Sequence, residues 1–300
     1  MTPRLERPAT NVHRLRSNRH ARNRPGTHAV GLLTVVAVVA GAVLVLRSLE
    51  TSAEPNTTPT RSEGASSGAS YVRLPTASAL RRARLFATKR LGLVSFAFVD
   101  TSGALSCYRC RVKYHSASVV KVMLLVSYLN RLANENDAIP ADHEAYLNSM
   151  IRASDNAATT AIYAHVSDEG LYQLAEKAQM TDFHVSGGWG SARITAADQA
   201  RFFANLDDVA APEFRTYVRE LLSSIIPEQS WGIPEVSRPE WSTFFKGGWL
   251  TTRRGNLVHQ VARLERGTSS MAIAILTDGD PSDSYGRETI RGLAKRLLRP

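Results

Sequence analysis

Cysteine is scarce in this sequence of 300 residues, in which Cys107 and Cys110 are the only two. A structural zinc site needs more thiolate or imidazole ligands than this pair supplies, so the pair does not indicate a zinc centre. No cysteine lies near the apolar run at 29–46, which excludes a bacterial lipoprotein anchor. A redox pair of the thioredoxin type should open a helix, whereas this C-x-x-C lies between strand-like runs.

The two cysteines are expected as structural thiols, which we favour, or as a disulfide. If residues 104–114 form one extended strand, three steps of about 3.3 Å separate the two Cα atoms by about 10 Å. A disulfide requires a separation below about 7 Å. A bridge between Cys107 and Cys110 therefore needs a turn or a bulge.

Acidic residues are almost absent from residues 1–28, which contain seven arginines and one acid, Glu6. Residues 29–46 then carry no charge, and Arg47 closes this run of 18 residues. A bilayer span needs about 20 apolar residues, with a lower limit of roughly 17. The positive-inside rule places the arginines in the cytoplasm and the chain after residue 47 outside. We predict a basic cytoplasmic tail at 1–28 and a transmembrane anchor at 29–46.

A cleaved signal peptide is the alternative, because small residues offer a cleavage point after Ala53. The apolar run is long for a signal peptide, and so is the basic segment before it, so we favour the anchor. Topology accounts for the arginines more simply than a nucleic-acid partner does. Residues 47–76 are rich in Ser, Thr, Pro and Gly, which predicts a flexible stalk.

Internal repeats are absent, and residues 77–300 are predicted to form one folded domain. It begins with a helix at 77–90 and a hairpin of strands at 93–100 and 104–114. Helical patterns then lie at 118–133, 141–152, 156–166, 169–179, 195–206 and 212–225. Strand patterns at 242–250, 256–265 and 269–278 precede a last helix at 285–299. This order predicts an α/β (α+β) fold, in which helices and an all-helical lobe flank a mostly antiparallel five-stranded sheet.

The first candidate motif is Ser118-Val-Val-Lys121, at the start of an apolar helix. Residues i and i+3 share a helix face, so the hydroxyl and the amine can meet within one turn. The positive helix N-terminus and the apolar neighbours both disfavour a protonated amine, and a neutral lysine can accept the serine proton. For this motif alone, an amphipathic helix with a single lysine is the commoner explanation.

Two further motifs follow along the chain. Ser154-Asp155-Asn156 lies in a predicted loop between helices, where these residue types also serve as N-caps. Lys246-Gly247-Gly248 lies within a predicted strand, where glycine also marks a bulge. Each motif alone has this structural explanation, but the three in this order are far more specific.

Together the motifs resemble the S-x-x-K, S-D-N and K-[TS]-G set of class A β-lactamases and penicillin-binding proteins. The resemblance covers about residues 77–300. It implies that Ser118 is the acylated nucleophile and that Lys121 is its base. It also implies that Ser154 relays a proton towards the leaving nitrogen, and that Asn156 holds a substrate carbonyl.

The same resemblance assigns the third motif to substrate binding. Lys246 would supply positive potential for a substrate carboxylate. Gly248 and Trp249 would line the substrate site, and the backbone N–H groups of Ser118 and Trp249 would form an oxyanion hole. The implied substrates are β-lactams or cell-wall peptides, and no cofactor is implied.

A glutamate is missing where class A β-lactamases carry E-x-x-L-N, the motif of their deacylating base. The corresponding stretch, about 180–195, contains no glutamate, and its one acidic residue is Asp182. Asp182 can replace the missing base if its loop folds over the nucleophile. The letters of the motif occur at 144–148, which lies too early in the chain for that role. Gly247 also replaces the usual hydroxyl residue. We therefore expect a membrane-anchored, extracytoplasmic serine hydrolase that is a poor β-lactamase. The alternative is a penicillin-binding or sensor-like module without turnover.

Overall fold

The computed structural model describes residues 75–299. The predicted tail, the predicted span and nearly all of the predicted stalk lie outside the described residues. One hydrophobic core connects the sheet and the helices of the described part. No helix between residues 75 and 299 is long and apolar enough to span a membrane.

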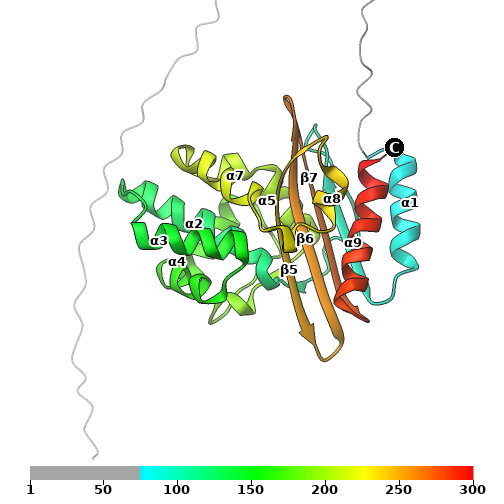
Figure 1. Ribbon diagram of the computed structural model, residues 1–300, viewed down its shortest axis with the longest axis horizontal. Helices are drawn as coiled ribbons and strands as arrows, with labels where there is room; N and C mark the ends of the chain where they lie inside the picture. The colour runs from blue at the N-terminus through cyan, green and yellow to red at the C-terminus, as the bar shows by residue number, and fades with distance from the viewer. Residues whose placement is uncertain (1–74, 300) are drawn as a thin grey trace, which may run out of the picture. The chain divides into compact units, whose positions relative to one another are not determined.

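A five-stranded sheet forms the centre of the domain, with the strand order β2-β1-β7-β6-β5 (Figure 1). Each neighbouring pair in it is antiparallel. The strands are β1 (Leu93–Val99), β2 (Leu105–Tyr108), β5 (Ser242–Thr252), β6 (Gly255–Arg266) and β7 (Ser269–Asp280). Because β1 pairs with β7, the two ends of the domain build one sheet, which confirms the predicted architecture. The third motif lies on β5, at an edge of this sheet.

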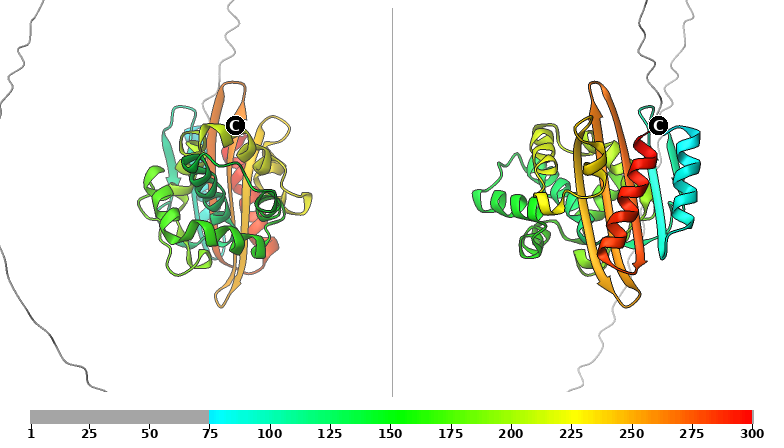
Figure 2. Two further views of the ribbon diagram at one scale, coloured as in Figure 1. Left: turned by 90° about the vertical axis from the view of Figure 1, so that its left-hand side faces the viewer. Right: turned by 45° about the vertical axis from the view of Figure 1, so that its right-hand side comes forward.

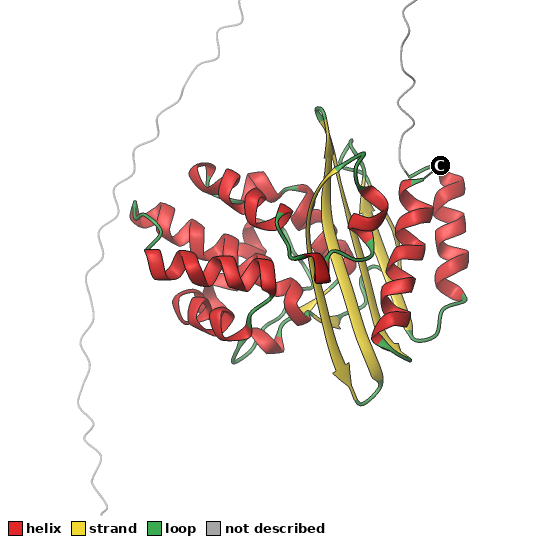
Figure 3. Ribbon diagram, viewed as in Figure 1, coloured by secondary structure: helices red, strands yellow, loops and turns green. Residues whose placement is uncertain are grey.

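Helices cover both faces of the sheet (Figures 2 and 3). On one face, α1 (Ala77–Thr88) lies beside α9 (Asp283–Leu298). The two helices pack closely at Gly292, where a Cβ atom would lie 2.4 Å from the ring of Phe86. On the other face, α5 (Ala196–Ala204) packs against β1 and β7. The sheet is therefore buried on both sides, which explains the unbroken burial from Met271 to Thr277.

The predicted all-helical lobe is present on the side of α5. It contains α2 (Val120–Glu135), α3 (Ala141–Asn148), α4 (Asn156–Lys177), α6 (Leu206–Val209) and α7 (Arg215–Ser223). Every residue of α2 from 120 to 129 is buried, as expected for a helix that is apolar all round. Ser167, with a φ of 59°, breaks α4 between the two helices predicted for this region. The short helix α8 (Ile233–Ser237) was not predicted.

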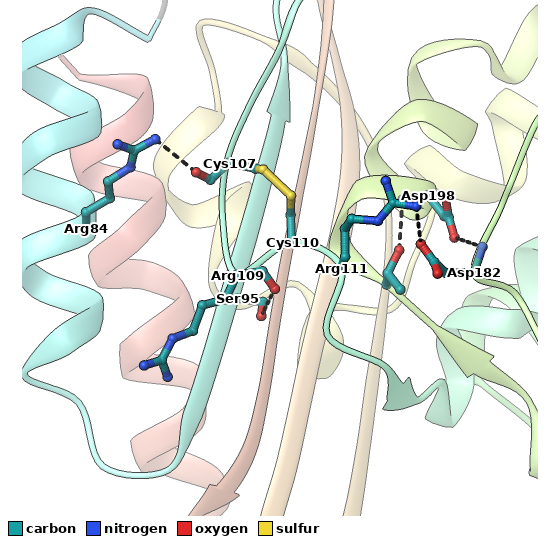
Figure 4. The surroundings of a disulfide bond; sticks show 9 residues. Arg84, Ser95, Cys107, Arg109, Cys110, Arg111, Asp182 and Asp198 are labelled. Carbon is teal, nitrogen blue, oxygen red and sulfur yellow. Dashed lines mark hydrogen bonds and ion pairs between the residues drawn. A yellow bond between two sulfur atoms is a disulfide. The ribbon is translucent and has the colours of Figure 1, made fainter.

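The predicted strand at 104–114 is interrupted, and the favoured assignment of free thiols was wrong. β2 ends at Tyr108, and Arg109 adopts a left-handed conformation with a φ of 49°. This turn brings the Cα atoms of Cys107 and Cys110 to 5.7 Å, and the two cysteines form a disulfide (Figure 4). The Ser95 hydroxyl holds the turn by donating to the Arg109 carbonyl at 2.7 Å. The chain then enters β3 (Tyr114–His115), which pairs with β4 (Arg193–Ile194) in a separate sheet.

Candidate active site

Ser118 lies in a 3₁₀ turn, Ala117–Val119, that leads directly into α2. Its neighbour Ala117 has a φ of 44°, a left-handed conformation that is uncommon for a residue with a side chain. Such backbone conformations cost roughly 1–3 kcal/mol each and cluster at functional sites. The Ser118 side chain is half-buried, and within residues 75–299 no hydrogen bond engages its hydroxyl. The hydroxyl is therefore not committed to a structural interaction.

The fully buried side chain of Lys121 reaches the loop of the second motif. Its Nζ donates to the Ser154 carbonyl oxygen at 2.5 Å and to Ser154 Oγ at 3.2 Å. It also donates to Asn156 Oδ1 at 2.8 Å. Burial lowers the pKa of Lys121 to about 8, although the nearby Asp155 carboxylate acts in the opposite direction. An amine with this pKa can exchange protons near neutral pH.

The backbone of the second motif is bent to present its side chains. A π-helical turn, Ser149–Ala153, ends at Ser154, which has a left-handed φ of 62°. Asp155 then caps α4, because its carboxylate accepts a hydrogen bond from the Ala158 N–H at 2.7 Å. Asn156, the first residue of α4, offers its Oδ1 to the lysine amine. The motif thus serves as a helix cap and as a lysine-binding loop at the same time.

Lys246, on β5, reaches the same serine from the sheet. Its buried Nζ donates to Ser154 Oγ at 3.1 Å and to the Gly247 carbonyl at 3.1 Å. Burial, followed by the charge of Lys121, lowers the pKa of Lys246 to about 7. A hydroxyl oxygen has two acceptor positions and one proton. Because both lysines donate to Ser154 Oγ, the Ser154 proton remains available for a third group.

Gly248 lets β5 approach Ser118 closely. A Cβ atom at this position would lie 2.9 Å from the Ser118 backbone nitrogen and 3.1 Å from that of Val119. No larger residue fits there without a shift of the backbone. The next residue, Trp249, is 37% exposed and packs edge-to-face on Trp231 with 6.3 Å between ring centroids. The edge strand β5 and the turn that carries Ser118 therefore lie directly against each other.

Comparison with known protein families identifies the family of this chain. The model of a family described as "Beta-lactamase enzyme family" matches residues 141–299, more than half of the chain. The chain belongs to the beta-lactamase enzyme family. The matched range contains the second and third motifs, whereas Ser118 lies before it.

Several solved structures share the fold of this chain. A β-lactamase from Sphaerobacter thermophilus aligns with a TM-score of 0.66 at 18% identity, over 75% of this chain and 97% of that chain. PBP-A aligns with a TM-score of 0.65 at 14% identity, over 75% and 98%. A β-lactamase from Streptosporangium roseum aligns with a TM-score of 0.64 at 14% identity, over 75% and 98%. A search of the curated proteins found no match.

In this beta-lactamase family member, the segment after α4 brings Trp189 to the lysine. Nζ of Lys121 lies 5.4 Å from the centroid of the indole ring. The indole Nε1 donates to the Thr160 hydroxyl on α4 at 3.3 Å. The Asp168 carboxylate holds the same segment by accepting from the Gly187 N–H at 2.7 Å. A ring that cannot accept a proton therefore lies beside the amine.

Asp182, the carboxylate that could have replaced the missing glutamate, is engaged elsewhere. It forms an ion pair of 3.1 Å with Arg111, next to the disulfide (Figure 4). Its backbone N–H donates to Asp198 Oδ2 at 3.0 Å.

Gly247 stands where the third motif of the family usually has a Thr or Ser. A Cβ atom at Gly247 would lie 3.4 Å from the ring of Trp231, so an aromatic side chain borders the place of the missing hydroxyl.

His259 is a supporting residue that the sequence did not indicate. It lies on β6 opposite Gly248, and its ring is fully buried. Its Nδ1 accepts from the Thr277 N–H at 3.2 Å, so its Nε2 carries the proton and donates to the His115 carbonyl at 2.9 Å. Burial lowers the pKa of His259 to about 4. The ring ties the sheet to β3, three residues before Ser118.

Proposed function

We propose that this chain is a membrane-anchored, extracytoplasmic serine hydrolase that opens β-lactams or cell-wall peptide amide bonds through an acyl-enzyme at Ser118. The observation that carries this proposal is the convergence of two buried lysine amines on one serine hydroxyl. Two buried amines within 3.2 Å of Ser154 Oγ destabilise the core, because burial disfavours their charged forms. Perturbed ionisable groups of this kind gather at sites of proton transfer.

Lys121 is the proposed base of the first step. Its pKa of about 8 leaves a fraction of neutral amine at pH 7, which accepts the proton as Ser118 Oγ attacks the carbonyl carbon. The C–N bond of the substrate then breaks, and the leaving nitrogen needs a proton. Ser154 can donate its own proton outward and recover one from Lys121, with which it already shares a hydrogen bond. Protons therefore balance over the acylation step.

Substrate contacts follow from the remaining groups. The backbone N–H groups of Ser118 and Trp249 are the proposed oxyanion hole, and the close packing of Gly248 on the Ser118 nitrogen supports this assignment. Because Asn156 Oδ1 accepts from Lys121, its Nδ2 group can donate to a substrate carbonyl. Lys246, when protonated, attracts a substrate carboxylate.

Release of the acyl group is slow in this proposal. Hydrolysis of the ester requires a base that activates water. The indole of Trp189 lies beside Lys121, and Asp182 is paired with Arg111, so neither supplies that base. We therefore expect this protein to be a poor β-lactamase that forms a long-lived adduct. The alternative is a penicillin-binding or sensor-like module without turnover, which acylates slowly or never.

The proposed location rests on the sequence and on the disulfide. The uncharged run at 29–46 supports a single span with residues 1–28 in the cytoplasm and the stalk at 47–76 outside. The bridge between Cys107 and Cys110 fits this orientation, because disulfides persist in oxidising compartments. Protease added to intact cells should remove the domain and leave a membrane-bound stub. Mature protein in the medium that starts near residue 54 would refute the anchor.

Labelling with a fluorescent penicillin tests the proposed chemistry. The full-length protein should acquire one label, and peptide mass analysis should place it on Ser118. Ser118→Ala should acquire none while it keeps the circular-dichroism spectrum of the wild type. A label on the Ser118→Ala variant, or none on the wild type, would refute the assignment.

A further inference from the structure

The outer face of α1 is cationic and partly apolar. Four exposed cations lie on this helix and its C-cap: Arg81, Arg82, Arg84 and Lys89. The helix contains no acidic residue, and within residues 75–299 none of these four cations forms an ion pair with a carboxylate. Arg84 does donate to the Cys107 carbonyl at 3.0 Å. The other three cations therefore present unneutralised charge to the solvent.

Two leucines interrupt this charge. Leu85 is 62% exposed, and so is Leu91 in the turn that follows the helix. The buried face of α1 is marked by Ala79, Ala83 and Ala87, and at 100° per residue Leu85 lies almost opposite them. Arg82 and Arg84 flank Leu85 on its two sides. The solvent face thus has an apolar centre with a cationic rim.

The neighbouring helix extends the same charge. Lys295 and Arg299, near the end of α9, are exposed, and Arg296 stacks on the ring of Phe86 at 3.9 Å from its centroid. Figure 1 shows α1 as the outermost element on this side of the sheet, away from the helical lobe. The α1 face therefore lies on the side of the domain opposite α2 and α4, which carry the candidate active site.

We propose that this face of α1 docks on an anionic lipid surface. Cations near a lipid headgroup layer attract anionic lipids, and exposed leucines between them can enter the boundary between headgroups and acyl chains. Leucine side chains gain nothing from a soluble polyanion, so the apolar centre favours lipid over such a polymer. Docking through α1 would turn the helical lobe and Ser118 away from the membrane. This inference does not depend on the predicted span or on the proposed catalysis.

A local probe on the full-length protein tests the docking. An environment-sensitive dye is attached at Thr88→Cys, on the outer face beside Leu85, and in a control protein at Glu176→Cys, an exposed position on α4. The proteins are combined with vesicles of phosphatidylcholine alone or with 30% phosphatidylglycerol, with and without a lipid-borne quencher. We expect a blue shift and quenching at position 88 only with the anionic vesicles, and no change at 176. No response at 88, or an equal response at 176, would overturn the proposal.

Charge variants separate docking through α1 from general attraction. Each cation near an anionic surface contributes about 1 kcal/mol, so Arg82→Gln with Lys89→Gln should weaken docking at position 88 about 25-fold. The matched control, Lys177→Gln with Arg253→Gln, removes the same charge from exposed sites elsewhere and should have little effect. An equal loss of docking in the two double variants would overturn the proposal. A blue shift at position 88 with soluble polyphosphate as large as that with anionic vesicles would also overturn it. Co-flotation with neutral vesicles tests the span separately, because docking requires anionic lipid.

Discussion

The indole of Trp189 lies against the amine of Lys121, with 5.4 Å between the ring centroid and Nζ. The same amine donates hydrogen bonds to Ser154 Oγ and Asn156 Oδ1, and the proposed mechanism uses it as the base of acylation. The indole offers no proton acceptor to a water molecule on its side of the amine. We therefore expect acylation of Ser118 to be faster than hydrolysis of the acyl-enzyme. A base is in place for the first step, whereas the indole supplies none for the second.

Replacing Trp189 by glutamate is expected to speed release of a penicilloyl group from Ser118. A carboxylate beside Lys121 can activate water, and a general base typically contributes about 10²–10⁴-fold. We expect the rate of release to increase by an amount near the lower end of this range, because no neighbouring group holds the new carboxylate in position. The matched control is Trp189→Gln, which removes the indole without adding a base. Equal release rates in the two variants would show that space, rather than a missing base, limits deacylation.

Loss of the Lys121 amine is expected to abolish acylation of Ser118 by a β-lactam or an activated ester. Removal of a general base should lower the rate by about 10²–10⁴-fold, while the fold survives. Lys113→Ala, which removes an exposed lysine just before β3, is the matched control. Stopped-flow labelling of both variants checks the prediction. Wild-type kinetics in folded Lys121→Ala would refute the role of this lysine.

The rate of acylation is expected to rise with pH between about 7 and 9. The base must be neutral, and burial lowers the pKa of Lys121 to about 8. Protonation of this amine at lower pH removes the base. Labelling rates measured from pH 5.5 to 9 provide the check. A rate that is flat, or that falls as the pH rises, would contradict lysine catalysis.

Lys246→Met is expected to stabilise the domain while it impairs labelling. The folded state binds the Lys246 proton more weakly than the unfolded chain does, because its pKa falls from 10.5 to about 7. This penalty is complete below pH 7 and disappears as the pH rises towards the unfolded value. Replacing a buried charge by an apolar side chain should raise the free energy of unfolding by roughly 1–4 kcal/mol at pH 6.5. Urea unfolding at pH 6.5 and 9.5 should show a larger increase in the free energy of unfolding at the lower pH. An equal decrease at both pH values would contradict the destabilising burial of the Lys246 amine.

The disulfide is expected to stabilise the folded domain without affecting acylation. The loop that it closes contains only the residues from Cys107 to Cys110, so loop-closure entropy predicts a contribution of about 2 kcal/mol. The double variant Cys107→Ser with Cys110→Ser should therefore unfold at lower urea concentration and label at the wild-type rate. A large loss of labelling would indicate that the turn at Arg109 positions the nucleophile through β3.

The five strands of the sheet, the helical lobe and the three motifs could be predicted from the sequence, because alternation, turn residues and motif spacing are local signals. The left-handed conformations of Ala117 and Ser154 could not, since neither residue type favours them and tertiary contacts impose them. The turn at Arg109 escaped prediction for the same reason, and with it the disulfide. The contact between Trp189 and Lys121 could not be predicted, because the sequence shows only an aromatic residue in a loop. The position of that loop depends on its hydrogen bond to Asp168.

Intact mass spectrometry of the protein with benzylpenicillin, followed over time, tests the central claim most directly. The leaving group of a β-lactam stays tethered, so only water can complete the reaction. We predict an adduct of one penicillin mass on Ser118 that forms within minutes and persists for hours after free drug is removed, with no adduct on Ser118→Ala. Rapid consumption of many equivalents of penicillin without a persistent adduct would contradict this account and show that another base serves the second step.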